Sequence, residues 1–198
     1  IGTMENGFAG LGTELVFDDS ESLTDLLGRI ADAAENGTFV YGGRRGDSLP
    51  LFTEGECAMW MNSSAYYAGI SDQAEFAFGQ AMLPVDTSAA EAPQNSIIGG
   101  ATLWVLEGHE AEEYQGVAEF FDYMSRPEVQ ADWHQSTGYV PITTAAWELS
   151  QEQGFYEQEP GTDTAIRQLS LNEPTANSAG LRFGNFVQIR DIINEELE

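Results

Sequence analysis

Hydrophobic residues recur at helical spacing along much of the chain. One such stretch opens at Ser20 or Ser22, either of which is a suitable N-cap, and Gly37 supplies its end. Its apolar residues share one helical face: Leu23, Leu26, Leu27, Ile30 and Ala34. The same spacing predicts further helices over 64–72, 110–124, 127–136, 143–153, 162–171 and 186–197, and a helical turn within 47–54.

Compact apolar runs between these helices predict strands. They cover 14–17, 57–61, 76–83 and 97–106, and the last is the strongest of them. Strands that alternate with helices at this spacing indicate an α/β fold built around a largely parallel sheet.

The charge balance narrows the range of partners. The chain has 33 acidic and 7 basic residues, all of the basic ones arginine, and a formal net charge of −26. Such a surface repels nucleic acids and anionic lipids, so neither is expected as a partner. The absence of lysine suits a protein adapted to high salt. A cation-binding surface is the alternative, but no D-x-D-x-D-G loop supports it.

Cysteine and histidine offer no metal site. Cys57 has no second cysteine to pair with, and His109 and His134 lie far apart in the sequence. We expect each histidine to be packed or solvated. No cofactor or metal is expected.

Three places carry candidate binding chemistry. Ser63 and Ser64 precede a predicted helix whose free N–H groups would suit an anion, although an ordinary N-cap has the same sequence. Gly100 interrupts a strong strand, which is typical of a bulge or of a close approach to a ligand. Arg190 stands among apolar residues, and either a ligand anion or one of the many carboxylates is its partner.

Motifs of common enzyme classes are missing from the sequence. There is no G-x-S-x-G, P-loop, G-x-G-x-x-G or H-E-x-x-H pattern. A secreted acidic serine hydrolase with Ser63 or Ser64 as nucleophile remains the rival class, and it would need a positioned base. A binding protein without enzyme activity is the preferred interpretation.

Several longer stretches resemble one family. The run PQNSIIGGATLWV at 93–105 is the most specific, and the others cover 52–59, 133–143, 152–157 and 180–185, continuing through 188–190 and 195–198. They resemble the periplasmic glycerol-3-phosphate-binding receptors of ABC importers, which are extracellular solute-binding proteins. The resemblance covers most of the chain from residue 52 onward.

The resemblance implies a fold and a ligand site. The fold is a periplasmic-binding-protein-like, type II (maltose-binding-like) arrangement of two α/β lobes, with residues 1–92 and 139–198 in the C-terminal lobe and 93–138 in the N-terminal one. The ligand would lie in the cleft between the lobes. Its donors would be the Ser63 hydroxyl, the Gly100 backbone N–H, the Tyr139 phenol and the Arg190 guanidinium.

The resemblance also implies the setting. We expect a monomer in the periplasm or elsewhere outside the cytoplasm, delivering its ligand to the permease subunits of an ABC importer. Whole members of the family are longer, so a further N-terminal part carrying most of one lobe, and room for a membrane anchor, are expected upstream of Ile1.

The sequence departs from the family near Ser63. Trp60, Met61 and Asn62 precede this serine, and Tyr66 and Tyr67 follow it, where smaller residues are typical. Because of these changes, the chemical identity of the end of the ligand that carries no phosphate stays open. Glycerophosphodiesters such as glycerophosphocholine, and then a neutral oligosaccharide, are the alternative ligands.

Overall fold

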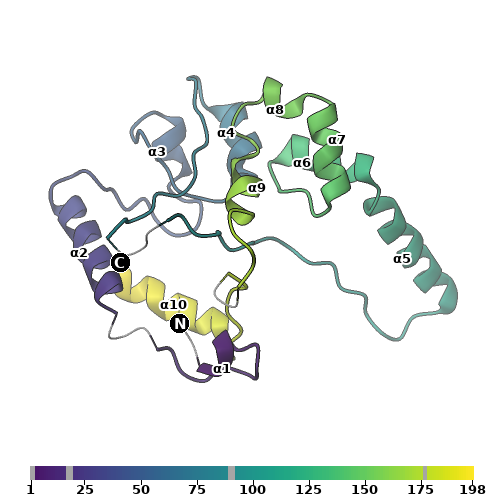
Figure 1. Cartoon of the computed structure of the whole chain (residues 1–198), viewed down its shortest axis with the longest axis horizontal. Coiled ribbons are helices and arrows are strands. Elements are labelled where there is room, and N and C mark those ends of the chain that lie inside the picture. The colour runs from purple at the N-terminus through teal and green to yellow at the C-terminus, as the bar shows by residue number, and fades with distance from the viewer. Residues whose placement is uncertain (1–2, 17–19, 89–91, 176–177) are drawn as a thin grey trace. The chain divides into compact units, whose positions relative to one another are not determined.

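The structure is a computed structural model that describes residues 3–16, 20–88, 92–175 and 178–198 (Figure 1). Contacts within the chain separate two compact units. Unit 1 comprises Ile1–Trp60, Pro84–Ile97 and Ser170–Glu198, and unit 2 comprises Met61–Leu83 and Ile98–Leu169. Each unit is described by itself below. The predicted lobe boundaries stay a prediction.

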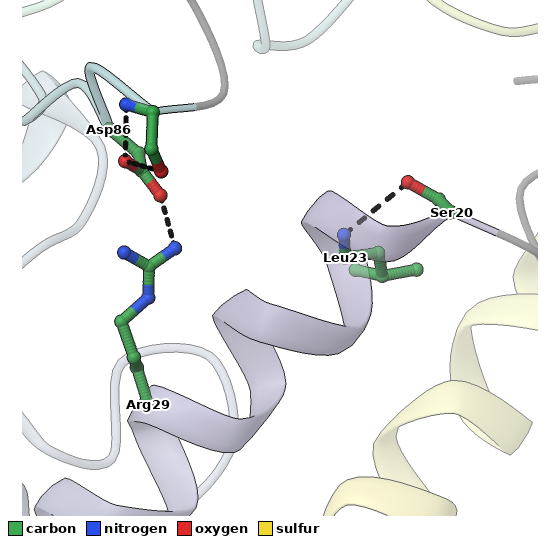
Figure 2. A network of polar contacts seen from close by, with 5 residues as sticks. Ser20, Leu23, Arg29 and Asp86 are labelled. Carbon is green, nitrogen blue, oxygen red and sulfur yellow. Dashed lines mark hydrogen bonds and ion pairs between the residues drawn. The ribbon is translucent and has the colours of Figure 1, made fainter.

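The described residues of unit 1 form four helices. They are α1 (Thr3–Asn6), α2 (Glu21–Glu35), α3 (Leu49–Thr53) and α10 (Phe186–Leu197). The longest, α2, begins where its sequence predicts, because the Ser20 hydroxyl accepts a hydrogen bond from the Leu23 N–H at 3.3 Å (Figure 2). The turn at α1 was not predicted, since Met4 and Glu5 take left-handed backbone angles that helical spacing does not signal.

Two polar clusters tie these helices to distant segments of unit 1. The Arg29 guanidinium of α2 pairs with Asp86, whose carboxylate also accepts hydrogen bonds from Ser88 (Figure 2). At the end of α10, the Glu198 carboxylate accepts hydrogen bonds from the Tyr41 hydroxyl at 2.7 Å and from Arg44. Both clusters are largely exposed, so each contributes little to the free energy of unfolding, although it links two segments that are distant in the sequence.

Unit 2 contains the short 3-10 helix η1 (Ser64–Tyr66) and six α-helices: α4 (Tyr67–Gln73), α5 (Ala111–Met124), α6 (Pro127–Thr137), α7 (Thr144–Glu152), α8 (Phe155–Gln158) and α9 (Thr164–Leu169). Its best-buried contact is the one between α6 and α7, which lie side by side in Figure 1. Small residues allow the approach, since Ala131 is 1% exposed and Ala146 is fully buried.

The helices of unit 2 follow their local sequence signals. The predicted helix over 110–124 appears as α5, with Glu110 and Glu113 forming a reciprocal capping box at its start. Pro127 opens α6, where its missing N–H costs nothing, and Gly138 ends it at φ 81°. The helix predicted over 64–72 is correct in place but begins as the 3-10 turn η1. The four-residue helix α8 was not predicted.

The predicted strands are not confirmed. Within the described residues, the β-pairing consists of one isolated parallel bridge, between Gly12 and Phe183. Residue 17, at the end of the first predicted strand, lies outside the described residues. The strongest predicted strand, 97–106, is unpaired and exposed, with Trp104 at 84% and Leu106 at 71%. A strand requires a neighbour to accept and donate its backbone hydrogen bonds, and no described segment supplies one here.

None of the helices in the described part of the chain has the length and apolarity that crossing a bilayer requires.

Candidate binding site in unit 2

Ser63 caps a short helix. Its side-chain oxygen accepts a hydrogen bond from the Ala65 N–H at 3.3 Å, and its own N–H donates to the Asn62 side-chain oxygen at 2.8 Å. The helix that it caps begins with the 3-10 turn η1 and continues directly into the seven residues of α4. The Ser63 side chain is exposed. The cap uses only its oxygen, as an acceptor, so its hydroxyl hydrogen can still be donated to another group.

Gly138 brings a distant segment against the residue that follows Ser63. Its backbone has φ 81°, and a Cβ atom added to it would lie 2.5 Å from the Ser64 carbonyl oxygen and 2.9 Å from the Tyr67 Cβ. No other residue fits this position without a shift of the backbone. Since Tyr139 follows Gly138, this close approach brings two predicted ligand residues, Ser63 and Tyr139, into one neighbourhood.

Tyr139 is held by its main chain. Its N–H donates to the Thr137 hydroxyl oxygen at 3.2 Å, and its carbonyl accepts a hydrogen bond from Nδ1 of His134. The side chain, by contrast, is 43% exposed. A tyrosine with a fixed backbone and an accessible phenol is suited to hydrogen-bond a ligand with little loss of entropy on binding.

His134 lies beneath this loop. It is 2% exposed, and its Nε2 accepts a hydrogen bond from the Tyr156 hydroxyl at 3.0 Å. Burial lowers the pKa of His134 below its usual value, an effect partly offset by the Tyr139 carbonyl. Burial likewise raises the pKa of Tyr156 to about 12. The sequence identified His134 only as a packed or solvated residue. The available signal in the sequence for a role near the ligand was that His134 stands five positions before Tyr139, a predicted ligand residue.

The aromatic residues that depart from the family pattern pack into their own units. The Tyr67 hydroxyl of unit 2 donates to the Glu159 carboxylate at 2.5 Å, and its ring centroid lies 5.9 Å from that of Phe78. Burial and then this bond raise the pKa of Tyr67. In unit 1, the Trp60 Nε1–H donates to the Ser48 hydroxyl at 2.8 Å. Both side chains therefore have structural contacts of their own.

Gly100 has an unusual backbone and open surroundings. Its φ is 141°, which side-chain-bearing residues rarely adopt, and a Cβ added there would meet nothing within 4 Å. Glycine is thus required here for backbone conformation and not by a close contact within the protein. The predicted bulge in a strand is instead a position in an exposed segment without regular secondary structure.

Arg190 lies on α10 of unit 1, whereas the other three predicted ligand residues belong to unit 2. The side chain is exposed, and its guanidinium forms no ion pair with any carboxylate in the described part of the chain. The alternative prediction of a structural ion pair thus has no support among those residues. The structure brings Gly138, which precedes Tyr139, against Ser64, which follows Ser63, and the ligand-binding roles of Ser63, Gly100, Tyr139 and Arg190 all stay predictions.

Alternative chemistry has little support in unit 2. A serine hydrolase would need a free base, but both ring nitrogens of His134 are already hydrogen-bonded. His109, just before α5, makes an edge-to-face contact with Tyr114, and its Nδ1 lies 3.5 Å from the Glu113 carboxylate. Across the ranges that the structure describes, no group of three or more histidine, cysteine, aspartate or glutamate side chains could hold a metal ion.

Comparison with known proteins identifies a family and several relatives. Residues 2–161 match the family described as bacterial extracellular solute-binding protein. The sn-glycerol-3-phosphate-binding periplasmic protein UgpB of Yersinia pseudotuberculosis is 47% identical over all 198 residues, which cover 45% of that relative. The protein of the same name from Pectobacterium atrosepticum is 46% identical over 100% of this chain and 44% of its own length. The one from Escherichia coli K12 is 47% identical over 98% of this chain and 44% of its own length. The chain thus spans less than half the length of these curated relatives.

Proposed function

The chain belongs to the bacterial extracellular solute-binding protein family, and from this premise we propose that it is part of a receptor that binds sn-glycerol-3-phosphate for an ABC importer. The observation that supports the proposal is the close approach of Gly138 to the Ser64 carbonyl, because Gly138 precedes Tyr139 and Ser64 follows Ser63 in the sequence. The names of the relatives supply the ligand class, since each is a glycerol-3-phosphate-binding periplasmic protein.

The proposed donors suit a phosphate monoester. A phosphate dianion that leaves water needs several hydrogen-bond donors, and charge-assisted bonds are the strongest of them. The Ser63 and Tyr139 hydroxyls and the Gly100 N–H are neutral donors, whereas Arg190 would supply the positive charge in a planar fork that matches two phosphate oxygens. The exposed guanidinium, unpaired with any described carboxylate, is compatible with this role.

The remaining parts of the proposal concern the protein's setting. The receptor would act without catalysis, as a monomer outside the cytoplasm or in the periplasm, and would deliver its ligand to membrane permease subunits. The finer fold proposed is the α/β, two-lobe, maltose-binding-like arrangement, with 93–138 in a different lobe from 1–92 and 139–198. Glycerophosphodiesters and neutral oligosaccharides are the alternative ligands.

The test is a calorimetric titration of the full-length protein with sn-glycerol-3-phosphate, glycerophosphocholine and maltose. We expect the first to bind most tightly and to be recovered unchanged. Tighter binding of glycerophosphocholine would reassign the ligand to a diester, and binding of maltose alone would refute a phosphate site. Release of inorganic phosphate or glycerol at a steady rate would instead support the hydrolase class.

A further inference from the structure

The contact between His134 and Tyr139 determines how the His134 ring is protonated. A carbonyl oxygen can only accept, so the His134 Nδ1 that meets the Tyr139 carbonyl must carry a hydrogen. In the neutral ring Nε2 is then an acceptor, and the Tyr156 hydroxyl donates to it at 3.0 Å. The two partners together select one neutral tautomer of the imidazole.

The surroundings of the ring favour this neutral form. Its centroid lies 5.6 Å from the ring centroid of Phe155 and 5.8 Å from that of Tyr156, and the side chain is 2% exposed. A positive charge in this place would lose its hydration, and burial accordingly lowers the pKa of His134.

The charged groups on neighbouring elements do not compensate for that loss. Helix α6 contacts α4, α5 and α7, and the aromatic contacts of His134 come from α8. Every aspartate and glutamate on α4, α5, α6, α7 and α8 is exposed to solvent: Asp72, Glu112, Glu113, Glu119, Asp122, Glu128, Asp132, Glu148, Glu152 and Glu157. The titratable group that contacts the ring is Tyr156, and burial raises its pKa to about 12, which keeps it uncharged. The half-buried Asp163, which adds to this rise, is itself paired with Arg167 at 3.1 Å.

We propose that His134 is a positioning residue for ligand binding, whose neutral ring fixes the Tyr139 main chain and whose protonation in mild acid loosens it. The proposal rests on the proposed function, because Tyr139 is there a ligand donor. When Nε2 gains a proton, Tyr156 can no longer donate to it, and a charge appears among aromatic rings. The Nδ1–H still donates to the Tyr139 carbonyl in the charged ring, so this contact breaks only when the ring leaves its buried place to regain hydration. The loop that carries Tyr139 then loses its anchor, and the ligand is released more readily as the pH falls.

The test compares the full-length wild type with His134→Asn. The asparagine amide can still donate to the Tyr139 carbonyl from near the position of Nδ1, but it does not titrate. Titrations with sn-glycerol-3-phosphate are made near pH 7.5 and near pH 5.5, about one unit on each side of the pKa of an ordinary histidine. The ligand's phosphate also titrates, near pH 6, but it affects both proteins equally.

The expected result is a difference between the two proteins. The affinity of each protein near pH 5.5 is compared with its own affinity near pH 7.5, so the two proteins need not bind equally well at the start. On acidification the wild type should lose at least about threefold more affinity than His134→Asn, within the limit of about tenfold per pH unit that one proton allows. Equal losses in the two proteins would overturn the proposal.

A measurement without ligand separates this proposal from the proposed function. Nitrogen-15 NMR of the histidine rings near neutral pH should show His134 protonated at Nδ1 alone, and Tyr156→Phe, which keeps the aromatic ring, should allow a mixture of tautomers. A ring protonated at Nε2 would refute the positioning role even if the ligand binds. Failure of sn-glycerol-3-phosphate to bind any of the proteins, with the expected tautomer observed, would refute the ligand assignment alone. Tyr156→Phe also provides the comparison if His134→Asn does not fold.

Discussion

Replacing Gly138 with alanine tests the contact on which the candidate site depends. Two terms add in this variant. A non-glycine residue at φ 81° costs about 1–2 kcal/mol in free energy of unfolding. The new Cβ would also lie 2.5 Å from a main-chain carbonyl oxygen, which cannot turn aside as a flexible side chain can, and a forced backbone shift costs about 1–3 kcal/mol. Gly138→Ala should thus destabilise the protein by about 2–5 kcal/mol in total.

Gly154→Ala is the matched control, because Gly154 lies in the same unit at φ 70°, and an added Cβ would meet only side-chain ends at 3.6 Å. It should show the backbone term alone, about 1–2 kcal/mol. Urea unfolding gives the free energies, and titration with sn-glycerol-3-phosphate gives the affinities. Because the shift separates Tyr139 from Ser63, only Gly138→Ala should weaken binding. Equal losses of stability and unchanged affinity in both variants would show that the approach of Gly138 to Ser64 does not organise the site.

The other predictions concern charge. Arg190→Ala should weaken binding of sn-glycerol-3-phosphate by about 2–5 kcal/mol. The control Arg182→Ala, which removes another exposed arginine of unit 1, should have little effect. Similar affinities for both variants would show that Arg190 does not bind the ligand. The melting temperature should rise from tens of millimolar to about 1 M monovalent salt, as screening reduces repulsion within a chain of net charge −26, and a flat or falling curve would refute an adaptation to salt. Hydrogen bonds from Ser88 and then from Arg29 lower the pKa of Asp86 to about 2, so Ser88→Ala and Arg29→Gln should each raise this pKa in a carboxyl NMR titration. Since the folded value lies below the usual one, this stabilising effect is present above about pH 4 and is lost as the pH falls through 2.

The helices could be predicted because their signals are local. Ser20 caps α2, Glu110 opens α5, Pro127 starts α6 and Gly138 ends it, and each acts within one turn of its own position. Helix α8 was missed because four residues are too few to show a helical period. Prediction from sequence therefore succeeded wherever the chain's neighbours in sequence determine its conformation.

The predicted strands are not confirmed, because a strand depends on residues that are distant in the sequence. An apolar run such as 97–106 records a preference for burial and extended backbone, but a strand also requires a hydrogen-bonding neighbour that is distant in sequence. The candidate site likewise depends on a contact between residues that are distant in the sequence. The resemblance predicts Ser63 and Tyr139 as ligand residues, whereas the fit of Gly138 against Ser64, which brings their two segments together, could not be predicted from the local sequence around either one.

The negative charge of the chain is compatible with an anionic ligand only if the hydrogen-bond donors that contact the ligand outweigh the long-range repulsion. At low ionic strength, a net charge of −26 repels a phosphate dianion over distances of about 10 Å or more. In about 1 M salt the Debye length is close to 3 Å, so the ligand responds mainly to the groups that it contacts. A single arginine is then sufficient as the charged donor, provided that no neighbouring carboxylate neutralises it. The Arg190 guanidinium, which makes no ion pair with the described carboxylates in a chain of 33 acidic residues, has the property that such a receptor requires.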